Sequence, residues 1–468
     1  MEKNSRAKLL GEEKVSKALF KLAVPAIIGM MINAIYNVVD TAFVGMLDNT
    51  SAIGAVSVAF PIFMLIGGVG LTFGMGGGSY ISRLLGEKNK KTADRVASTT
   101  FFTSLAVGIL FTILGLTFLE PLLKAFGSTD TILVYAKNYT SILIFGSTFT
   151  VMNMTQNNII RAEGNPMYSM IGMSLGAILN IVLDPLFMFV FDMGISGAAV
   201  ATVLAQGISF LFLVSYFLRG KSYVKVSIKY ITITKNLYGQ IMKIGIPTFA
   251  RQALSSLSIG LINRAAAPYG DSAVASMGIV LRIVSLGMFV IFGYSQGFQP
   301  LAGFNYGAKK FKRLHEAVSI SLKFTTIFST SIAIIFIIFA KPIMTIFSND
   351  QEVITIGASA LRAICILFPS FGFQNVYGIL HVALGKGIGS LILSMSRQGI
   401  FLIPAILIMP KIFNLNGVIY AQTVADFFTI IVTAIFAVSI KKELNKEEEF
   451  VCSQSIVDDS QCKDILSS

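Results

Sequence analysis

The chain has 468 residues, of which 54% are hydrophobic and only 13% are charged, and its mean hydropathy is +0.74. A soluble protein of this size carries about twice that charged fraction, so the composition excludes a soluble enzyme or binding domain. The net charge of +13 could suit a nucleic-acid-binding protein, but the basic residues lie in short loops between apolar runs, as in membrane proteins, and no nucleic-acid partner is expected.

The first apolar run extends from about residue 22 to residue 47, and Asp40 is its only charge. Tyr36 lies one helical turn before Asp40, so both side chains share one face of the expected helix. The second run, 51–85, is rich in glycine. Because the chain contains no G-x-x-x-x-G-K-[ST] sequence, these glycines indicate close helix packing rather than a nucleotide site, and no cofactor is expected.

Ten further apolar runs follow, and each is long enough to cross a bilayer as a helix. They cover approximately residues 96–118, 131–160, 168–191, 195–218, 238–268, 272–306, 316–340, 351–381, 388–410 and 416–440. The sequence therefore predicts an all-α integral membrane protein with twelve transmembrane helices.

The run from Tyr168 to Phe191 contains one charge, Asp184, and Asn180 lies one helical turn before it. A carboxylate inside a membrane helix is costly, which makes Asp184 a candidate functional residue. Pro185 follows directly, and it removes a backbone donor and can bend the helix at the charge. The run therefore predicts a polar site within the membrane.

Basic residues alternate between the loops. They are frequent in the segments before residue 22, at 83–95, 219–243 and 309–313, and after residue 440, whereas the intervening loops hold at most one each. This distribution predicts that both termini and all basic loops lie in the cytoplasm. An even number of membrane crossings agrees with that orientation.

The two halves of the chain resemble each other at an offset near 221 residues. Lys21-Leu22-Ala23-Val24-Pro25 recurs as Lys243-Ile244-Gly245-Ile246-Pro247. Because each half has six crossings, both halves enter the membrane from the same side, which predicts two six-helix bundles related by a pseudo-two-fold axis along the membrane normal. The expected parts are an N-terminal lobe (1–218), a cytoplasmic linker (219–237), a C-terminal lobe (238–440) and a polar, disordered tail (441–468).

The expected orientation gives the depth of the polar residues. Asp40, Asp184 and Thr202 each lie about eight residues from the outer end of their helices, or about 10–12 Å below the outer surface. Asn180 lies about one turn deeper. These four residues form an oxygen-rich set suited to Na⁺ or to a shared proton, because two carboxylates in low dielectric resist ionising together. The alternative is that each acid pairs with backbone or a hydroxyl for structural reasons.

The second lobe does not repeat this set. Asn263 falls near the place of Asp40, and Pro404 or Ala405 near that of Asp184. The charges within its apolar runs are Arg251, Arg282, Arg362, Arg397 and Asp426. Arg397 and Asp426 could form a structural ion pair or serve function. Ion coupling is therefore expected in the first lobe.

Amide and thioether side chains in the fourth and fifth runs could line a substrate pocket, because such surfaces adapt to different ligands. They are Asn153, Gln156, Asn157, Asn158, Met170 and Met173. Helix–helix hydrogen bonding is an equally good explanation of any single one. Glu163, in a cytoplasmic loop after Arg161, is expected either to form a surface ion pair or to attract cationic substrates.

Three sequences carry a resemblance to a known family. They are Asn37-Val38-Val39-Asp40-Thr41-Ala42-Phe43-Val44-Gly45, Arg161-Ala162-Glu163-Gly164-Asn165-Pro166 and Asn180-Ile181-Val182-Leu183-Asp184-Pro185. With Pro25 and the twelve-span repeat, the chain resembles the multidrug and toxic compound extrusion (MATE) family over residues 15–440, and most closely its bacterial DinF-like branch.

The resemblance implies a V-shaped pair of six-helix bundles that exports cationic, lipophilic drugs against inward H⁺ or Na⁺. It implies a cation network similar to Tyr36, Asp40, Asn180, Asp184 and Thr202. The acids of the other branch's C-terminal lobe are not evident here. We expect a monomer in a bacterial cytoplasmic membrane, with lipid and drugs as its partners.

Two other functions were weighed. A flippase for lipid-linked precursors would need a lateral, cationic groove for pyrophosphate; the arginines of the second lobe fit this function, whereas the acids of the first lobe do not. A channel or a purely structural membrane protein would leave the repeat and the asymmetric acids without a purpose. An ATP-driven pump is disfavoured by the missing nucleotide motif.

Overall fold

The computed structural model describes residues 2–47, 50–126, 128 and 130–454, and all regular structure in these residues is helical. The first lobe contains α1 (Glu2–Gly11), α2 (Val15–Gly45), α3 (Thr50–Gly86), α4 (Lys90–Thr117), α5 (Leu119–Ala125), α6 (Asp130–Phe145), α7 (Ser147–Ala162), α8 (Pro166–Pro185), η1 (Leu186–Val190) and α9 (Gly194–Leu218).

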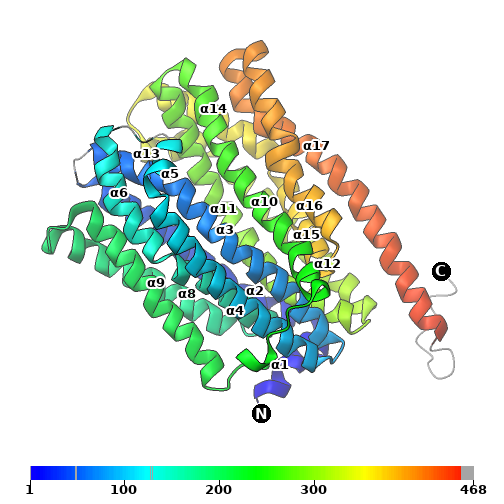
Figure 1. Cartoon of the computed structure of the whole chain (residues 1–468). Coiled ribbons are helices and arrows are strands. Elements are labelled where there is room, and N and C mark those ends of the chain that lie inside the picture. Colours follow the sequence, from blue (N-terminus) through cyan, green and yellow to red (C-terminus); the bar gives the residue numbers. More distant parts are fainter. Residues whose placement is uncertain (1, 48–49, 127, 129, 455–468) are drawn as a thin grey trace.

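The second lobe follows a mostly non-helical linker that includes η2 (Ile228–Tyr230). It contains α10 (Lys235–Ala266), η3 (Ala267–Tyr269), α11 (Asp271–Gly307), α12 (Phe311–Ile338), α13 (Ala340–Phe347), α14 (Gln351–Leu367), α15 (Pro369–Ala383), α16 (Gly387–Met395), η4 (Ser396–Ile400) and α17 (Leu402–Gln454). Figure 1 shows the long helices running side by side, with α1 at one end of the molecule.

The twelve expected crossings are present in the described part of the chain. Eight helical stretches are long and apolar enough to span a membrane, and α14 with α15, bent by 53°, make a further crossing. One of the eight, 387–453, holds two crossings because Asn414 (φ 51°) interrupts its helical path. The pair α6–α7 and the more polar α10 complete the set, which confirms the predicted twelve-helix architecture.

The backbone repeats as the sequence predicted. Lys88 and Lys309, 221 residues apart, have φ values of 58° and 55°. Asp192 and Asn414, 222 residues apart, have φ values of 53° and 51°. Positive φ is uncommon outside glycine, so its recurrence at matched positions marks equivalent turns of two copies of one fold.

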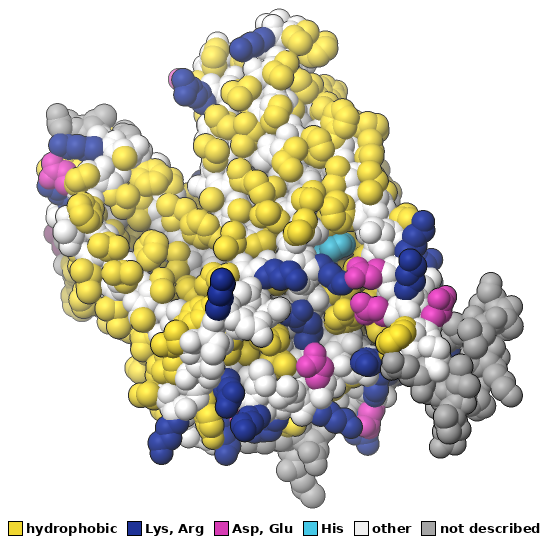
Figure 2. Space-filling view, turned by 45° about the vertical axis from the view of Figure 1, so that its right-hand side comes forward, with side chains coloured by type: hydrophobic (Ala, Val, Ile, Leu, Met, Phe, Trp, Pro, Cys, Tyr) yellow, Lys and Arg dark blue, Asp and Glu magenta, His cyan; other side chains and the backbone are white. Residues whose placement is uncertain are grey.

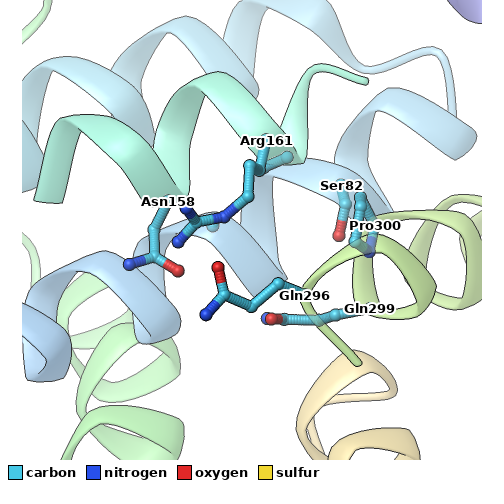
Figure 3. A pocket seen from close by; sticks show the side chains of 8 residues that line it. Ser82, Asn158, Arg161, Gln296, Gln299 and Pro300 are labelled. Atoms are coloured by element: carbon cyan, nitrogen blue, oxygen red, sulfur yellow. The ribbon is translucent and has the colours of Figure 1, made fainter. Parts of the chain in front are cut away.

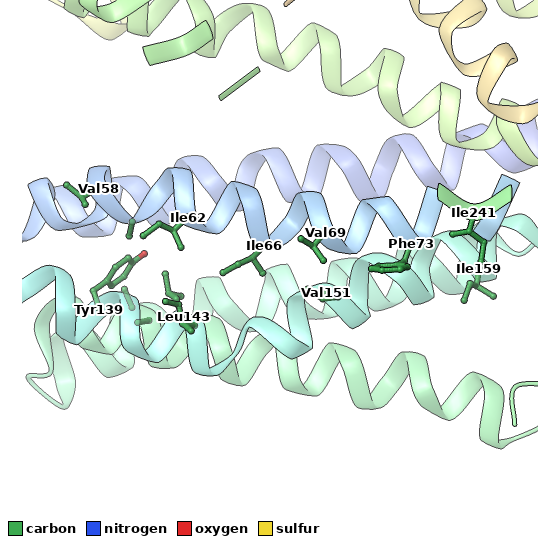
Figure 4. Packing of buried hydrophobic residues seen from close by; sticks show 14 of the residues in the cluster. Val58, Ile62, Ile66, Val69, Phe73, Tyr139, Leu143, Val151, Ile159 and Ile241 are labelled. Atoms are coloured by element: carbon green, nitrogen blue, oxygen red, sulfur yellow. The ribbon is translucent and has the colours of Figure 1, made fainter. Parts of the chain in front are cut away.

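The interior of the first lobe forms along α3. Val58, Ile62, Ile66, Val69 and Phe73 recur every three or four residues and are buried on one helical face. Figure 4 shows this face against side chains of α6 and α7. Close van der Waals packing of this kind is the main attraction between helices in lipid.

The two lobes meet through α2 and α3 of the first and α10 and α11 of the second. Glycines permit the approach: a Cβ on Gly297 would lie 2.6 Å from the Cα of Ala23, and a Cβ on Gly86 would lie 2.0 Å from the carbonyl oxygen of Phe304. These contacts lie toward the end that carries the basic loops. Figure 2 shows most Lys and Arg side chains at this lower end, and a notch between the lobes at the opposite end.

The predicted disorder of the tail is wrong for residues 441–454, which continue α17 as a helix. Leu444 is buried against the second lobe, Glu443 forms an ion pair with Lys386, and the Tyr306 hydroxyl donates to Glu447 over 3.2 Å. These contacts compensate the low apolar content that suggested disorder. Residues 455–468 lie outside the described residues.

The first helix, which the sequence did not predict, contacts both lobes at the basic end. Arg6 donates to the Tyr216 hydroxyl over 2.6 Å in the first lobe. Asn305 of the second lobe donates to the backbone oxygen of Leu10 over 3.0 Å, and Lys310 donates to that of Gly11 over 2.8 Å. The α1 helix therefore bridges the lobes where they are closed.

Candidate ion and substrate sites

The polar site of the first lobe lies where α2, α8 and α9 pack together. Asp184 occupies the last turn of α8, and Pro185 and the π-helix η1 follow it directly. Proline cannot donate to the preceding turn, and a π-turn in a helix is frequent at functional sites. The sequence thus breaks the regular helix at the buried carboxylate.

Asn180 connects the members of this site. Its Nδ2 atom donates to Asp184 Oδ1 over 3.1 Å and to Thr202 Oγ1 over 3.2 Å, and all three side chains are buried. Asn180 Oδ1 and Asp184 Oδ2 are also buried but have no hydrogen-bond partner among the described residues. Two unsatisfied oxygen acceptors in a buried site can bind a proton or a hard cation.

Asp40 and Tyr36 of α2 complete the group. The Asp40 carboxyl contacts that of Asp184 as a hydrogen-bonding neighbour, and Tyr36 contacts Thr202 in the same way. Neither acid forms an ion pair with any Lys, Arg or His in the described part of the chain. Two carboxyl groups can share a hydrogen bond only when one carries a proton, so the pair favours a bound positive charge.

The five residues expected to bind a coupling cation therefore lie together, and their function in coupling stays a prediction. The sequence analysis missed Tyr139 of α6, which is buried and within electrostatic range of Tyr36, Asp40 and Asp184. Tyr139 lies eight residues into the fourth expected crossing, which starts at residue 131. The same depth argument that selected Asp40 would have found it.

Several residues expected to line a substrate pocket instead hold helices together. Asn153 donates to Gln206 Oε1 over 2.6 Å, and Asn157 accepts from Ser169 over 2.7 Å while donating to a carbonyl of its own helix. Gln156 is fully buried, and both of its amide atoms lack a partner among the described residues. These contacts favour helix packing as their function in this conformation.

Asn158 lines a small polar pocket between the lobes. Figure 3 shows its side chain beside Arg161 of α7, facing Gln296 and Gln299 of α11. Ser82 and Pro300 also border the pocket. Arg161 lies 3.8 Å from the sulfur of Met173, and Met170 packs against Gly29. Of the expected substrate set, Asn158 is therefore placed at the lobe interface.

Glu163 does not lie on the surface, contrary to both expectations. It is 1% exposed and accepts hydrogen bonds from the Tyr216 hydroxyl over 2.9 Å and from the Tyr223 backbone N–H over 2.7 Å. Ser222 also donates to it, and Arg6 approaches within 3.9 Å. Burial raises the pKa of Glu163, and these donors oppose that rise. The carboxylate fastens the linker to the first lobe and is inaccessible to a substrate here.

In the second lobe, Arg397 and Asp426 form the ion pair that the sequence allowed. Arg397 Nε lies 2.7 Å from Asp426 Oδ1, and Gln422 donates to the same oxygen over 2.9 Å. Both charged side chains are nearly buried. The second lobe thus neutralises its buried acid, whereas the first lobe does not.

Known proteins agree with this architecture. The MatE family model matches the chain twice, at residues 25–186 and 247–408. Multidrug export protein MepA of Staphylococcus aureus (strain MSSA476) is 31% identical over 414 residues, covering 88% of this chain and 91% of that protein. MepA of Staphylococcus haemolyticus (strain JCSC1435) is 29% identical, covering 93% and 96%.

Solved structures are similar over nearly the whole chain. The outward-facing conformation of a multidrug resistance MATE family transporter of the MOP superfamily has a TM-score of 0.89 at 26% identity, covering 94% of this chain and 98% of that one. A MOP superfamily transporter from Pyrococcus furiosus, described as having reverse polarity of its binding pocket, has a TM-score of 0.88 at 27% identity, with the same coverage. The chain belongs to the MATE family, a family of membrane transporters and not of enzymes.

Proposed function

We propose that this protein exports multiple drugs by exchanging cationic, lipophilic compounds for inward-moving H⁺ or Na⁺. The name of the MepA relatives supports the export of drugs. The observation that carries the coupling is the contact between Asp40 and Asp184 without a basic partner among the described residues. A carboxyl pair in low dielectric gains most from binding one positive charge.

The coupling ion binds where the oxygens converge. A proton would be shared by the two carboxyl groups, with Asn180 holding Asp184 in place. Na⁺ would use the same carboxylates with Thr202 and the free amide oxygen of Asn180, since hard cations prefer oxygen ligands. Both ions would remove the repulsion between the acids.

Helix α2 links ion binding to the arrangement of the lobes. It carries Asp40, packs against α8 of its own lobe and also packs against α11 of the other. A change in charge at Asp40 therefore acts on a helix that both lobes contact. Exchange requires only that the ion and the drug prefer different arrangements of the lobes.

The distribution of charge supports the orientation that we propose. Most basic side chains lie at the closed end, together with α1 and the last turns of α17 (Figures 1 and 2). We assign this end to the cytoplasm of a bacterial cell, and the protein to the cytoplasmic membrane as a monomer with both termini inside. In this orientation the lobes open toward the outside.

A flippase for lipid-linked precursors is the second candidate, and one observation favours it. Arg251 of the second lobe forms no hydrogen bond or ion pair with any described residue, and it could bind a lipid phosphate. The buried acid pair gives an anionic lipid no advantage, so drug efflux is the better explanation of the whole site.

Ethidium transport by everted membrane vesicles tests the proposed exchange. A pH gradient and a Na⁺ gradient are imposed separately, and ethidium accumulation is followed by fluorescence. We expect one gradient to drive accumulation, and Asp184→Asn to abolish it without reducing the amount of protein in the membrane. Accumulation that is independent of both gradients would contradict antiport.

A further inference from the structure

The second lobe contains a positive charge that no described residue neutralises. Arg251 lies in the middle of α10, and its guanidinium forms neither a hydrogen bond nor an ion pair with the described residues. Its one assigned contact is with the ring of Phe292, whose centroid lies 5.8 Å from the guanidinium carbon. A cation–π contact leaves the five N–H donors of arginine available.

Arg251 points into the lobe rather than toward lipid. Ile244 and Ser258, seven residues away on either side, share its helical face and are fully buried. Ile246 and Leu257 on the other side of α10 are more than half exposed, as lipid-facing residues would be. Arg251 is nevertheless partly exposed, so its donors remain reachable from within the lobe.

Aromatic rings connect Arg251 with the buried ion pair. The rings of Phe292 and Phe371 meet edge to face at 5.7 Å, and Arg397 lies over Phe371 at 4.6 Å. Two guanidinium groups therefore flank one pair of rings. Asp426 neutralises Arg397, which leaves Arg251 as the uncompensated charge of this group.

We propose that Arg251, Phe292 and Phe371 form a binding site for the anionic group of an aromatic amphiphile, so that the transporter accepts zwitterionic as well as cationic compounds. The guanidinium pairs with a carboxylate or a phosphate through two N–H donors, and the rings contact the apolar body of the ligand. This inference extends the substrate class of the proposed efflux function and rests on that function for transport, but not for binding.

The division of charge between the lobes supports the inference. The first lobe carries two acids without a basic partner, and the second carries Arg251 without an acidic one. An uncompensated charge in low dielectric is costly unless a ligand meets it. A compound with one positive and one negative group meets both charges.

A matched pair of dyes tests the site. A cationic rhodamine methyl ester and its free acid share one ring system, but only the acid carries a carboxylate. Binding is measured by fluorescence polarisation on the purified full chain in detergent, without any ion gradient, so a failure of ion coupling does not affect the result. We expect Arg251→Gln to raise the Kd of the free acid about tenfold, because a charge-assisted pair is lost. The Kd of the ester should change less than about twofold.

Two variants control this experiment. Arg251→Lys keeps the charge and should retain most of the affinity for the free acid. Arg362→Gln removes an exposed arginine whose Nε donates to the Ile337 carbonyl oxygen, and it should change neither Kd. An equal loss of both dyes in Arg251→Gln, or no loss of either, would overturn the proposal.

Phosphatidylglycerol added to the same assay distinguishes two sources of the anionic group. Competition with the free acid that disappears in Arg251→Gln would assign the site to lipid phosphate as well. Absence of competition would restrict it to soluble aromatic acids. Phosphatidylcholine serves as the lipid control, and competition by it that persists in Arg251→Gln would contradict recognition of net negative charge.

Discussion

The two lobes share one backbone but differ in the charges that they bury. Matched left-handed turns at Lys88 and Lys309 show how closely the fold repeats. The first lobe buries Asp40 and Asp184 in contact and without a base, whereas the second pairs Asp426 with Arg397 and leaves Arg251 without an acid. The repeat therefore conserves helix packing, which depends on small and apolar residues, while a few polar substitutions give each lobe its own chemistry.

The largest expected effect breaks the function of one lobe alone. Asp184→Asn should lower gradient-driven ethidium transport by about a hundredfold or more, because a single barrier or binding term of about 2.7 kcal/mol has that effect. Asp40→Asn should do the same. Asp271→Asn, at the exposed start of α11, is the matched control and should transport normally. Transport by Asp184→Asn at the control rate would refute the coupling site.

The next prediction compares stability. Asp426→Asn leaves the buried Arg397 uncompensated and should destabilise the protein by about 3–5 kcal/mol. Asp184→Asn removes one of two neighbouring acids and should leave the melting temperature unchanged or raise it. Thermal unfolding of both purified variants measures the contrast. Arg397→Met combined with Asp426→Leu should recover the loss, and an equal fall in Asp184→Asn would show that both acids are structural.

A smaller effect should follow from Tyr139→Phe, which removes one hydroxyl beside the acid pair. A hydrogen bond contributes about 1 kcal/mol, so the concentration of the coupling ion at half-maximal transport should change about fivefold. Tyr269→Phe, whose hydroxyl donates to the Pro410 carbonyl oxygen in the second lobe, should leave this concentration unchanged. Equal shifts in the two variants would place Tyr139 outside the ion site.

The smallest effect concerns helix α7. Gln156→Leu replaces a buried amide without partners by an apolar group of similar size, so the free energy of unfolding should stay within about 1 kcal/mol of the parent or increase. Asn153→Leu breaks the contact with Gln206 and should lower the melting temperature. A large loss in Gln156→Leu would indicate a partner for the amide, such as a substrate or buried water.

Hydropathy and the high energy of buried charge predicted most of the fold and the acid pair. Asp40 and Asp184 are conspicuous in the sequence because carboxylates are so costly in lipid. Tyr139 is not, since a phenol ring is compatible with an apolar helix and its hydroxyl gains importance only from neighbours on α2 and α8.

Tertiary contacts explain the remaining differences. Glu163 looked like a surface acid because its loop is polar, but donors from the linker, some 60 residues later, bury it. Residues 441–454 looked disordered because they are rich in lysine and glutamate, but they dock through Leu444 and Glu447. Neither partner is close in sequence, so no local pattern could reveal the contact.

The bridging position of α1 has a practical consequence for assays. When the basic end opens, α1 must release either Tyr216 or Asn305, and it then travels with the lobe that keeps it. A purification tag or a fluorescent protein fused ahead of this helix would load a moving joint. Transport rates measured on such fusions would report the strain at that joint together with the turnover of the pump itself.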